Sequence, residues 1–168
     1  MKTLFRDRAA QFGFALGLVM IAAVAMAPAT FAANPFYFGT WKISSAVVAP
    51  WWNDPKTKPD DAEMKTLIGK TIAIQPARTS GPRLFNCDAP SYRVRSFPAD
   101  SLFQGSFGEM RDRNHLVDPE KVAASLGFKG KSWKTLETGC ANEIDYHFLD
   151  EMNAAIGLNN YVFFLKKQ

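Results

Sequence analysis

The chain has 168 residues, of which 47% are hydrophobic and 21% are charged, and its formal net charge is +4. These values exclude a disordered, collagen-like or coiled-coil protein and predict one globular domain. They also give no reason to expect nucleic-acid binding. That function needs basic residues clustered on one face, whereas the lysines and arginines here form separate short groups.

The first segment of the chain has the pattern of an export signal. Basic residues near the start precede an apolar run over residues 12–28, and small residues alternate just before Ala33. This pattern predicts a cleaved secretory signal peptide over residues 1–32. A membrane anchor is the alternative, but the run is shorter than the roughly 20 apolar residues that span a bilayer. We therefore expect a soluble periplasmic or secreted protein of residues 33–168, with no stable membrane anchor after cleavage.

The mature chain is predicted to be mainly β, with two short helices. A capping pattern at Asp60 and Glu63, and Asp118 before Pro119, place the helices at about 61–68 and 119–126. Because short strands follow one another through tight turns, we expect a single antiparallel meander that forms a barrel. Alternating or β-branched runs indicate strands at 41–49, 70–75, 91–97, 102–107, 143–149, 154–158 and 161–165.

One of these strands carries polar residues on a single face. Ile144, Tyr146 and Phe148 share one side, and Asp145 and His147 share the other. Asp145 and His147 could orient an imidazole or hold a metal ion. A solvent-facing polar side of an antiparallel strand is the simpler interpretation, and we predict no metal site.

The mature chain contains two cysteines, Cys87 and Cys140. Export brings them into an oxidising compartment, and they show no CxxC or zinc-ligand spacing. We therefore predict one disulfide between them. A reactive thiol pair is the alternative.

Gly39 and Trp41 lie near the predicted mature N-terminus, at the start of the first predicted strand. This Gly-x-Trp sequence resembles the motif that opens the first strand in lipocalins and related calycins. In that family the Trp closes the barrel floor, and an Arg near the last strand packs across its ring. Here the chain ends with Lys166 and Lys167, so a Lys would take the place of that Arg. The resemblance implies a lipocalin-like barrel with a pocket for a small apolar ligand.

No catalytic motif appears in the sequence, and we expect neither enzyme activity nor a cofactor. HExxH, P-loop, dinucleotide-binding and EF-hand patterns are absent. The stretch from Gly105 to Gly108, which contains Ser106, lacks the spacing of a GxSxG nucleophile turn, and we expect no helix after it.

Aromatic side chains supply the candidate ligand-binding residues. Most aromatic residues of a small β-domain belong to its core. Trp51 and Trp52 differ, because adjacent residues of an extended segment point in opposite directions. One of them is therefore a candidate for a pocket mouth or a partner surface, where Trp is enriched. The predicted ligand-binding residues are Trp41, Trp51, Trp52, Tyr92 and Phe103.

The sequence leaves three functional interpretations open. The first is an exported binding protein that holds a small apolar molecule in the barrel pocket. The second is an exported protein-interaction module or hydrolase inhibitor that acts on a protein partner through a rigid loop. The Pro-containing segment 76–90, tethered at Cys87, is the candidate for that loop. The third is an enzyme without a recognisable motif.

Overall fold

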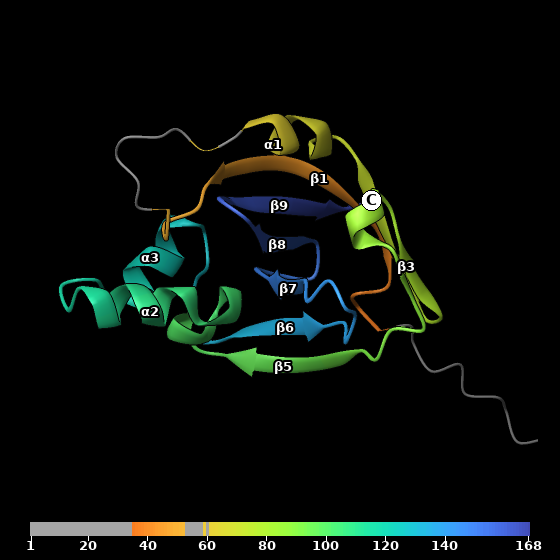
Figure 1. Ribbon diagram of the computed structural model, residues 1–168. Helices are drawn as coiled ribbons and strands as arrows, with labels where there is room; N and C mark the ends of the chain where they lie inside the picture. Colours follow the sequence, from red (N-terminus) through yellow and green to blue (C-terminus); the bar gives the residue numbers. More distant parts are fainter. Residues whose placement is uncertain (1–34, 53–58, 60) are drawn as a thin grey trace, which may run out of the picture. The chain divides into compact units, whose positions relative to one another are not determined.

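A nine-stranded antiparallel sheet organises the protein (Figure 1). The computed structural model describes residues 35–52, 59 and 61–168, so the predicted signal peptide, residues 1–32, lies outside the described residues. The predicted fold class, mainly β with an antiparallel meander, is confirmed. The strands are β1 Gly39–Val48, β2 Thr71–Gln75, β3 Arg78–Ser80, β4 Cys87–Asp88, β5 Arg93–Phe97, β6 Trp133–Glu137, β7 Asp145–Phe148, β8 Asn153–Leu158 and β9 Tyr161–Lys167.

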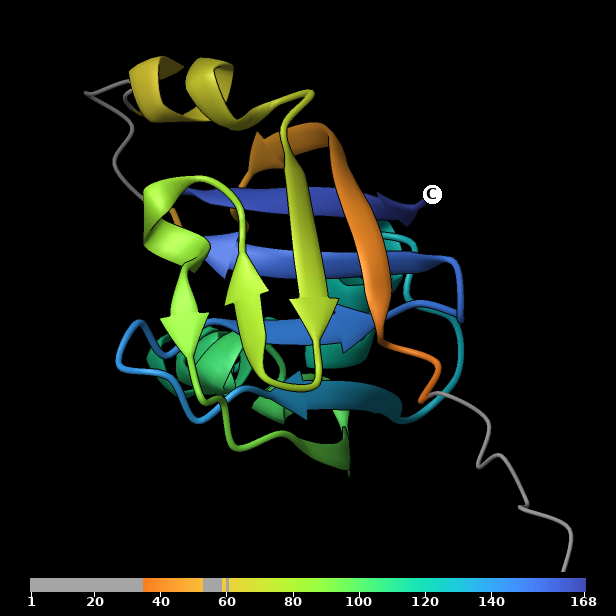
Figure 2. The same ribbon diagram turned by 90° about the vertical axis from the view of Figure 1, so that its right-hand side faces the viewer.

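Two meanders meet in the middle of this sheet. The strand order is β4-β3-β2-β1-β9-β8-β7-β6-β5, so the first strand pairs with the last. The chain passes from β4 to β5 without pairing them, which leaves β4 and β5 as the two edges of the sheet. Figure 2 shows β2, β3 and β4 passing across the front of β6 to β9. The sheet is therefore a curled half-barrel, and we call the gap between β4 and β5 the seam.

The two predicted helices are confirmed, whereas the predicted strand at 102–107 is wrong. The helices are α1 Asp61–Leu67, α2 Ser106–Arg113 and α3 Pro119–Ser125, with short 3-10 turns η1 Arg83–Phe85, η2 Ala99–Ser101 and η3 Phe103–Gly105. Gln104 and Gly105 have φ angles of 57° and 87°, which end any extended run at that point. Helix α2 begins directly afterwards, so the expectation that no helix follows Gly105 is also wrong.

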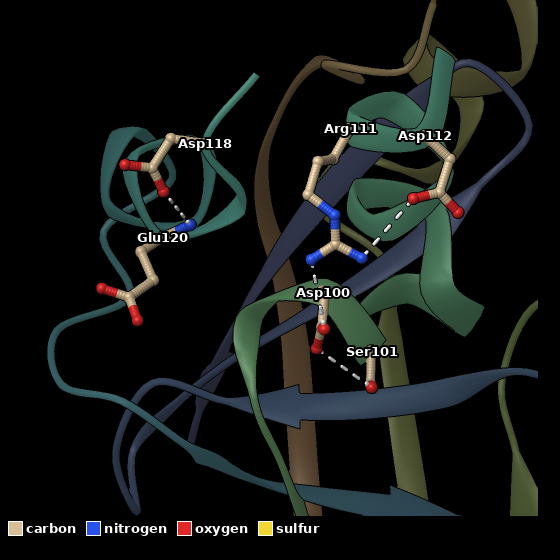
Figure 3. Close-up of polar contacts among 6 residues, drawn as sticks. All are labelled: Asp100, Ser101, Arg111, Asp112, Asp118 and Glu120. Atoms are coloured by element: carbon tan, nitrogen blue, oxygen red, sulfur yellow. Dashed lines mark hydrogen bonds and ion pairs between the residues drawn. The ribbon is translucent and has the colours of Figure 1, made fainter. Parts of the chain in front are cut away.

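Polar contacts join α2 to η2 and cap α3 (Figure 3). Arg111 of α2 forms ion pairs with Asp100 of η2 and with Asp112, each at 3.5 Å. Asp118 caps α3, because its carboxylate accepts a hydrogen bond of 3.0 Å from the backbone N–H of Glu120. The ion pair of Arg111 with Asp100 joins α2 to the turn that precedes it, and both elements belong to the layer that covers the sheet.

Each face of the sheet carries a hydrophobic cluster, although most residues of β5 and of β1 are exposed. The inner face, inside the curl, is filled by large side chains that include Trp41, Tyr146 and Phe163, each at most 2% exposed. The outer face packs against η2, η3, α2 and α3 through Phe103, Phe107 and other residues. The outer cluster consists of Ala49, Ala99, Leu102, Phe103, Phe107, Ala123, Leu126, Phe128, Trp133, Ala155 and Val162.

The seam is closed by a covalent bond and by side-chain hydrogen bonds. The predicted disulfide is confirmed and joins Cys87 of β4 to Cys140, which follows β6. The Tyr92 hydroxyl lies 2.9 Å from the carbonyl oxygen of Gln75 and 2.8 Å from the hydroxyl of Thr79. These bonds connect the two edges of the half-barrel without a strand pair.

Candidate functional site

A cavity of about 130 Å³ lies on the outer face of the sheet. We call it the outer-face cavity. Its walls come from β7, β8, the η3 turn, the first turn of α2 and the chain that follows β1. The residues that matter for its chemistry are Trp51, Phe103, Gln104, Ser106, Asp145 and His147, with Gly157 at the base.

Gly157 has no side chain, which leaves room for two aromatic rings of the cavity lining. A Cβ atom at this position would lie 3.0 Å from Cδ1 of Phe103 and 3.2 Å from Cη2 of Trp51. The two aromatic rings, whose centroids are 5.3 Å apart, therefore approach the backbone of β8 directly. The indole N–H of Trp51 donates a hydrogen bond of 3.2 Å to the carbonyl oxygen of Asn159, which fixes the ring at the cavity wall.

Left-handed backbone conformations are concentrated around the cavity. The non-glycine residues Phe103, Gln104, Glu143 and Asn159 have φ angles of 50°, 57°, 52° and 50°. The side-chain N–H of Gln104 donates to the carbonyl oxygen of Glu143, so the turn before α2 is tied to the turn before β7. Such conformations are costly for residues with a Cβ atom and tend to occur at functional sites.

His147 is buried and positions the η3 turn. Its Nε2 accepts a hydrogen bond of 3.1 Å from the backbone N–H of Phe103, and its Nδ1 lies 2.8 Å from the hydroxyl of Thr135. Because Nε2 accepts, the neutral ring carries its proton on Nδ1 and donates it to Thr135. Burial lowers the pKa of His147 to about 3, so the ring stays neutral. The prediction of a solvent-facing side for His147 is wrong, because η3 covers this part of β7.

Ser106 and His147 do not form a catalytic pair. Both ring nitrogens of His147 are already engaged, and the Ser106 hydroxyl donates a hydrogen bond of 2.7 Å to the carbonyl oxygen of Phe103. A general base must reach the proton that it removes. Among the described residues, no group of three or more His, Cys, Asp or Glu side chains is placed to hold a metal ion.

Asp145 presents a carboxyl group without a protein partner to the cavity. Within the described residues, this carboxyl group forms no hydrogen bond and no ion pair. Desolvation, with added contributions from the negative charges of Glu137 and Glu143, raises the pKa of Asp145 to about 6. Glu137 is itself paired with Arg95 at 3.2 Å. The cavity thus combines two aromatic rings with an unpaired carboxyl group.

The structure brings two of the five predicted ligand-binding residues together. Trp51 and Phe103 meet at the outer-face cavity, whereas Trp52 is half-buried outside its lining. Trp41 is fully buried in the inner cluster, and Tyr92 lies at the seam. The sequence analysis proposed no role for Gln104 or Ser106, which sit in a segment predicted as a strand, and none for Gly157.

Trp41 contacts the lysine that the Gly-x-Trp resemblance implies. The ammonium nitrogen of Lys167 lies 5.6 Å from the centroid of the Trp41 ring and donates a hydrogen bond to the carbonyl oxygen of Phe36. Gly39 has a φ angle of +136°, and a Cβ atom there would lie 3.0 Å from Cε of Lys167.

Comparison of the chain with family models, curated proteins and solved structures finds no match. The lipocalin-like relationship stays a prediction.

The segment 76–90, the predicted interaction loop, is anchored along its length. Phe85 is buried, Cys87 forms the disulfide, and the side-chain N–H of Asn142 donates a hydrogen bond of 2.7 Å to the carbonyl oxygen of Leu84. Its apex is the 3-10 turn η1, where Arg83 is exposed. The segment therefore presents a short helical turn and not an extended strand-like loop.

Proposed function

We propose that this protein is an exported binding protein and that its small-molecule site is the outer-face cavity. One observation carries the proposal: two aromatic rings line a half-open cavity together with a carboxyl group that has no partner among the described residues, and left-handed turns flank this cavity. Binding sites typically combine an apolar wall with a few polar groups that fix the orientation of the ligand. A volume of about 130 Å³ suits a ligand of only a few heavy atoms.

One finding supports export. The disulfide between Cys87 and Cys140 fits an oxidising compartment. Across residues 35–52, 59 and 61–168, no helix is long and apolar enough to cross a membrane.

The outer-face cavity suits a ligand better than the inside of the curl. Trp41, Tyr146 and Phe163 are almost completely buried on the inner face and occupy the space that a barrel pocket would need. Protein interiors are close-packed, so a ligand there would have to displace these side chains. The proposed site therefore differs from the pocket for an apolar molecule that the sequence analysis predicted.

The proposal can be tested by NMR on the mature, isotope-labelled protein. We would add mixtures of cationic, neutral and anionic fragments of a few heavy atoms, each at millimolar concentration. The expected result is a saturable change in the backbone signals of Gln104, Asp145 and Gly157 with at least one mixture. Signals that respond to no mixture, or that respond only on the inner face, would contradict the proposed site.

Tryptophan variants provide a matched pair for the same test. Trp51 lines the cavity, whereas Trp52, the next residue, does not. Trp51→Phe should weaken binding of any fragment that binds there, and Trp52→Phe should leave its affinity unchanged. Equal effects of the two substitutions would place the fragment elsewhere.

Interaction with a protein partner through segment 76–90 is the second candidate function. The observation that favours it is the exposed Arg83 in a segment fixed by the disulfide and by the buried Phe85. We rank this function second because the segment has a helical turn at its apex, whereas inhibitory loops that bind a hydrolase in a substrate-like manner are extended. Inhibition of a trypsin-like protease that is lost in Arg83→Ala would support it. Absence of inhibition at micromolar concentration would argue against this mode.

A further inference from the structure

We propose that the outer-face cavity selects a small organic ammonium ion, held between the carboxylate of Asp145 and the ring of Trp51. This inference rests on the proposed function and names the chemical class of the ligand. It is argued from the charges around Asp145, from the aromatic wall and from the size of the cavity.

The charges that face Asp145 are mainly negative. Glu137 of β6 lies directly opposite Asp145 of β7 in the strand register, and Glu143 lies two residues before Asp145 in the sequence. Arg95 of β5 pairs with Glu137 and not with Asp145, and its neighbour on the same strand, Arg93, forms no ion pair with Asp145 either. The η3 turn contributes only the uncharged Gln104, and His147 is neutral.

A cation would compensate this arrangement, and the other classes of ligand would not. An anion would meet the Asp145 carboxylate, and the described residues of the cavity lining include no Lys or Arg to compensate it. A neutral ligand could donate a hydrogen bond to the Asp145 carboxylate, but it would leave the negative charge of this half-buried group without a counter-charge. Desolvation by burial, together with the negative charges of Glu137 and Glu143, raises the pKa of Asp145, so its ionised form is the one that a cation would stabilise.

The aromatic wall favours an organic cation over a metal ion. The faces of Trp and Phe rings are electronegative and attract ammonium groups, most strongly where water is excluded. Trp51 and Phe103 contribute aromatic rings to the cavity lining, and Leu158 contributes an aliphatic side chain. A divalent metal ion needs several oxygen or nitrogen ligands, whereas among the described residues of the lining Asp145 is the only one with a carboxylate. A cavity of about 130 Å³ fits a methylated ammonium group.

The test compares tetramethylammonium chloride with tert-butanol, which has nearly the same shape but no charge. Sodium chloride at equal ionic strength is the control for salt effects. Titrations would be followed by tryptophan fluorescence and by the NMR signals of Gln104 and Gly157. We expect saturable binding of tetramethylammonium at millimolar concentration and binding of tert-butanol that is about tenfold weaker or more.

Asp145→Asn isolates the contribution of the charge. This substitution should lower the affinity for tetramethylammonium about tenfold and leave that for tert-butanol unchanged. The wild-type protein gives an independent measurement: affinity for the cation should fall as the pH decreases through about 6, because Asp145 becomes protonated. His147 stays neutral over this range.

The outcomes separate the two proposals. If both probes bind in the cavity equally well, or if neither Asp145→Asn nor acid pH weakens binding of the cation, the cavity binds ligands without selecting an ammonium ion. The inference is then overturned and the proposed function stands. If no probe and no fragment perturbs the cavity, both fail.

Discussion

Removal of the disulfide should destabilise the protein strongly, because the bond crosses the seam of the half-barrel. Cys87 and Cys140 are separated by 53 residues in the sequence. For a loop of this length, the chain-entropy model gives a stabilisation of about 4 kcal/mol. In a domain the size of residues 34–168 this corresponds to a decrease in Tm of roughly 10–15 °C. The double substitution Cys87→Ala and Cys140→Ala removes the bond without leaving a free thiol.

The assay is urea denaturation and thermal unfolding of the variant beside the wild-type protein with and without a reducing agent. The reduced wild-type protein should unfold like the variant, which separates loss of the bond from loss of the sulfur atoms. A decrease in unfolding free energy below about 1 kcal/mol would refute the reasoning. It would mean that the hydrogen bonds of Tyr92 and Asn142 hold the seam by themselves.

Three substitutions in the outer-face cavity test its packing and electrostatics. Because the folded state lowers the pKa of His147 to about 3, unfolding takes up a proton as the pH falls below about 6.5, and stability should decrease by up to about 1.4 kcal/mol per pH unit. His147→Gln should flatten this part of the pH profile, and an unchanged slope would contradict the assignment. Asp145 has the opposite sign, since folding raises its pKa to about 6. Asp145→Asn should therefore raise Tm by about 2 °C at pH 7.5, with the difference disappearing below about pH 4. Gly157→Ala should cost about 1–3 kcal/mol in urea denaturation, because its methyl group would lie 3.0 Å from the Phe103 ring. Unchanged or increased stability would show that the rings can move aside.

Much of the sheet could be predicted because apolar and polar residues alternate along its strands or because the strands are rich in β-branched and aromatic residues. Residues 70–75 and 161–165 follow these patterns, and they coincide with β2 and β9. β3 and β4 have only three and two residues, so they carry too little pattern to be recognised. The disulfide could be predicted because only Cys87 and Cys140 were available to form it.

The outer layer could not be predicted, because its signal lies in tertiary packing. The apolar residues Leu102, Phe103 and Phe107 led to the prediction of a strand. In the structure they lie in and beside η3 and in α2, and their side chains belong to the cluster on the outer face of the sheet. The expectation that His147 faces solvent fails for the same reason. A polar residue between apolar neighbours indicates an exposed face only when no second layer covers that face.

The two polar residues of β7 in the cavity have different roles. His147 belongs to the framework: it accepts the backbone N–H of Phe103 and so holds the η3 turn above Gly157. Both of its ring nitrogens form hydrogen bonds within the protein, so neither is free to bind a ligand. Asp145 lies two residues earlier on the same face, and its carboxyl group has no partner within the described residues. The hydrogen bonds of the fully buried imidazole are satisfied within the protein, whereas the half-buried carboxyl group is the one that the proposed ligand would pair with. Asp145 is therefore the residue whose substitution should change binding with the least change in structure.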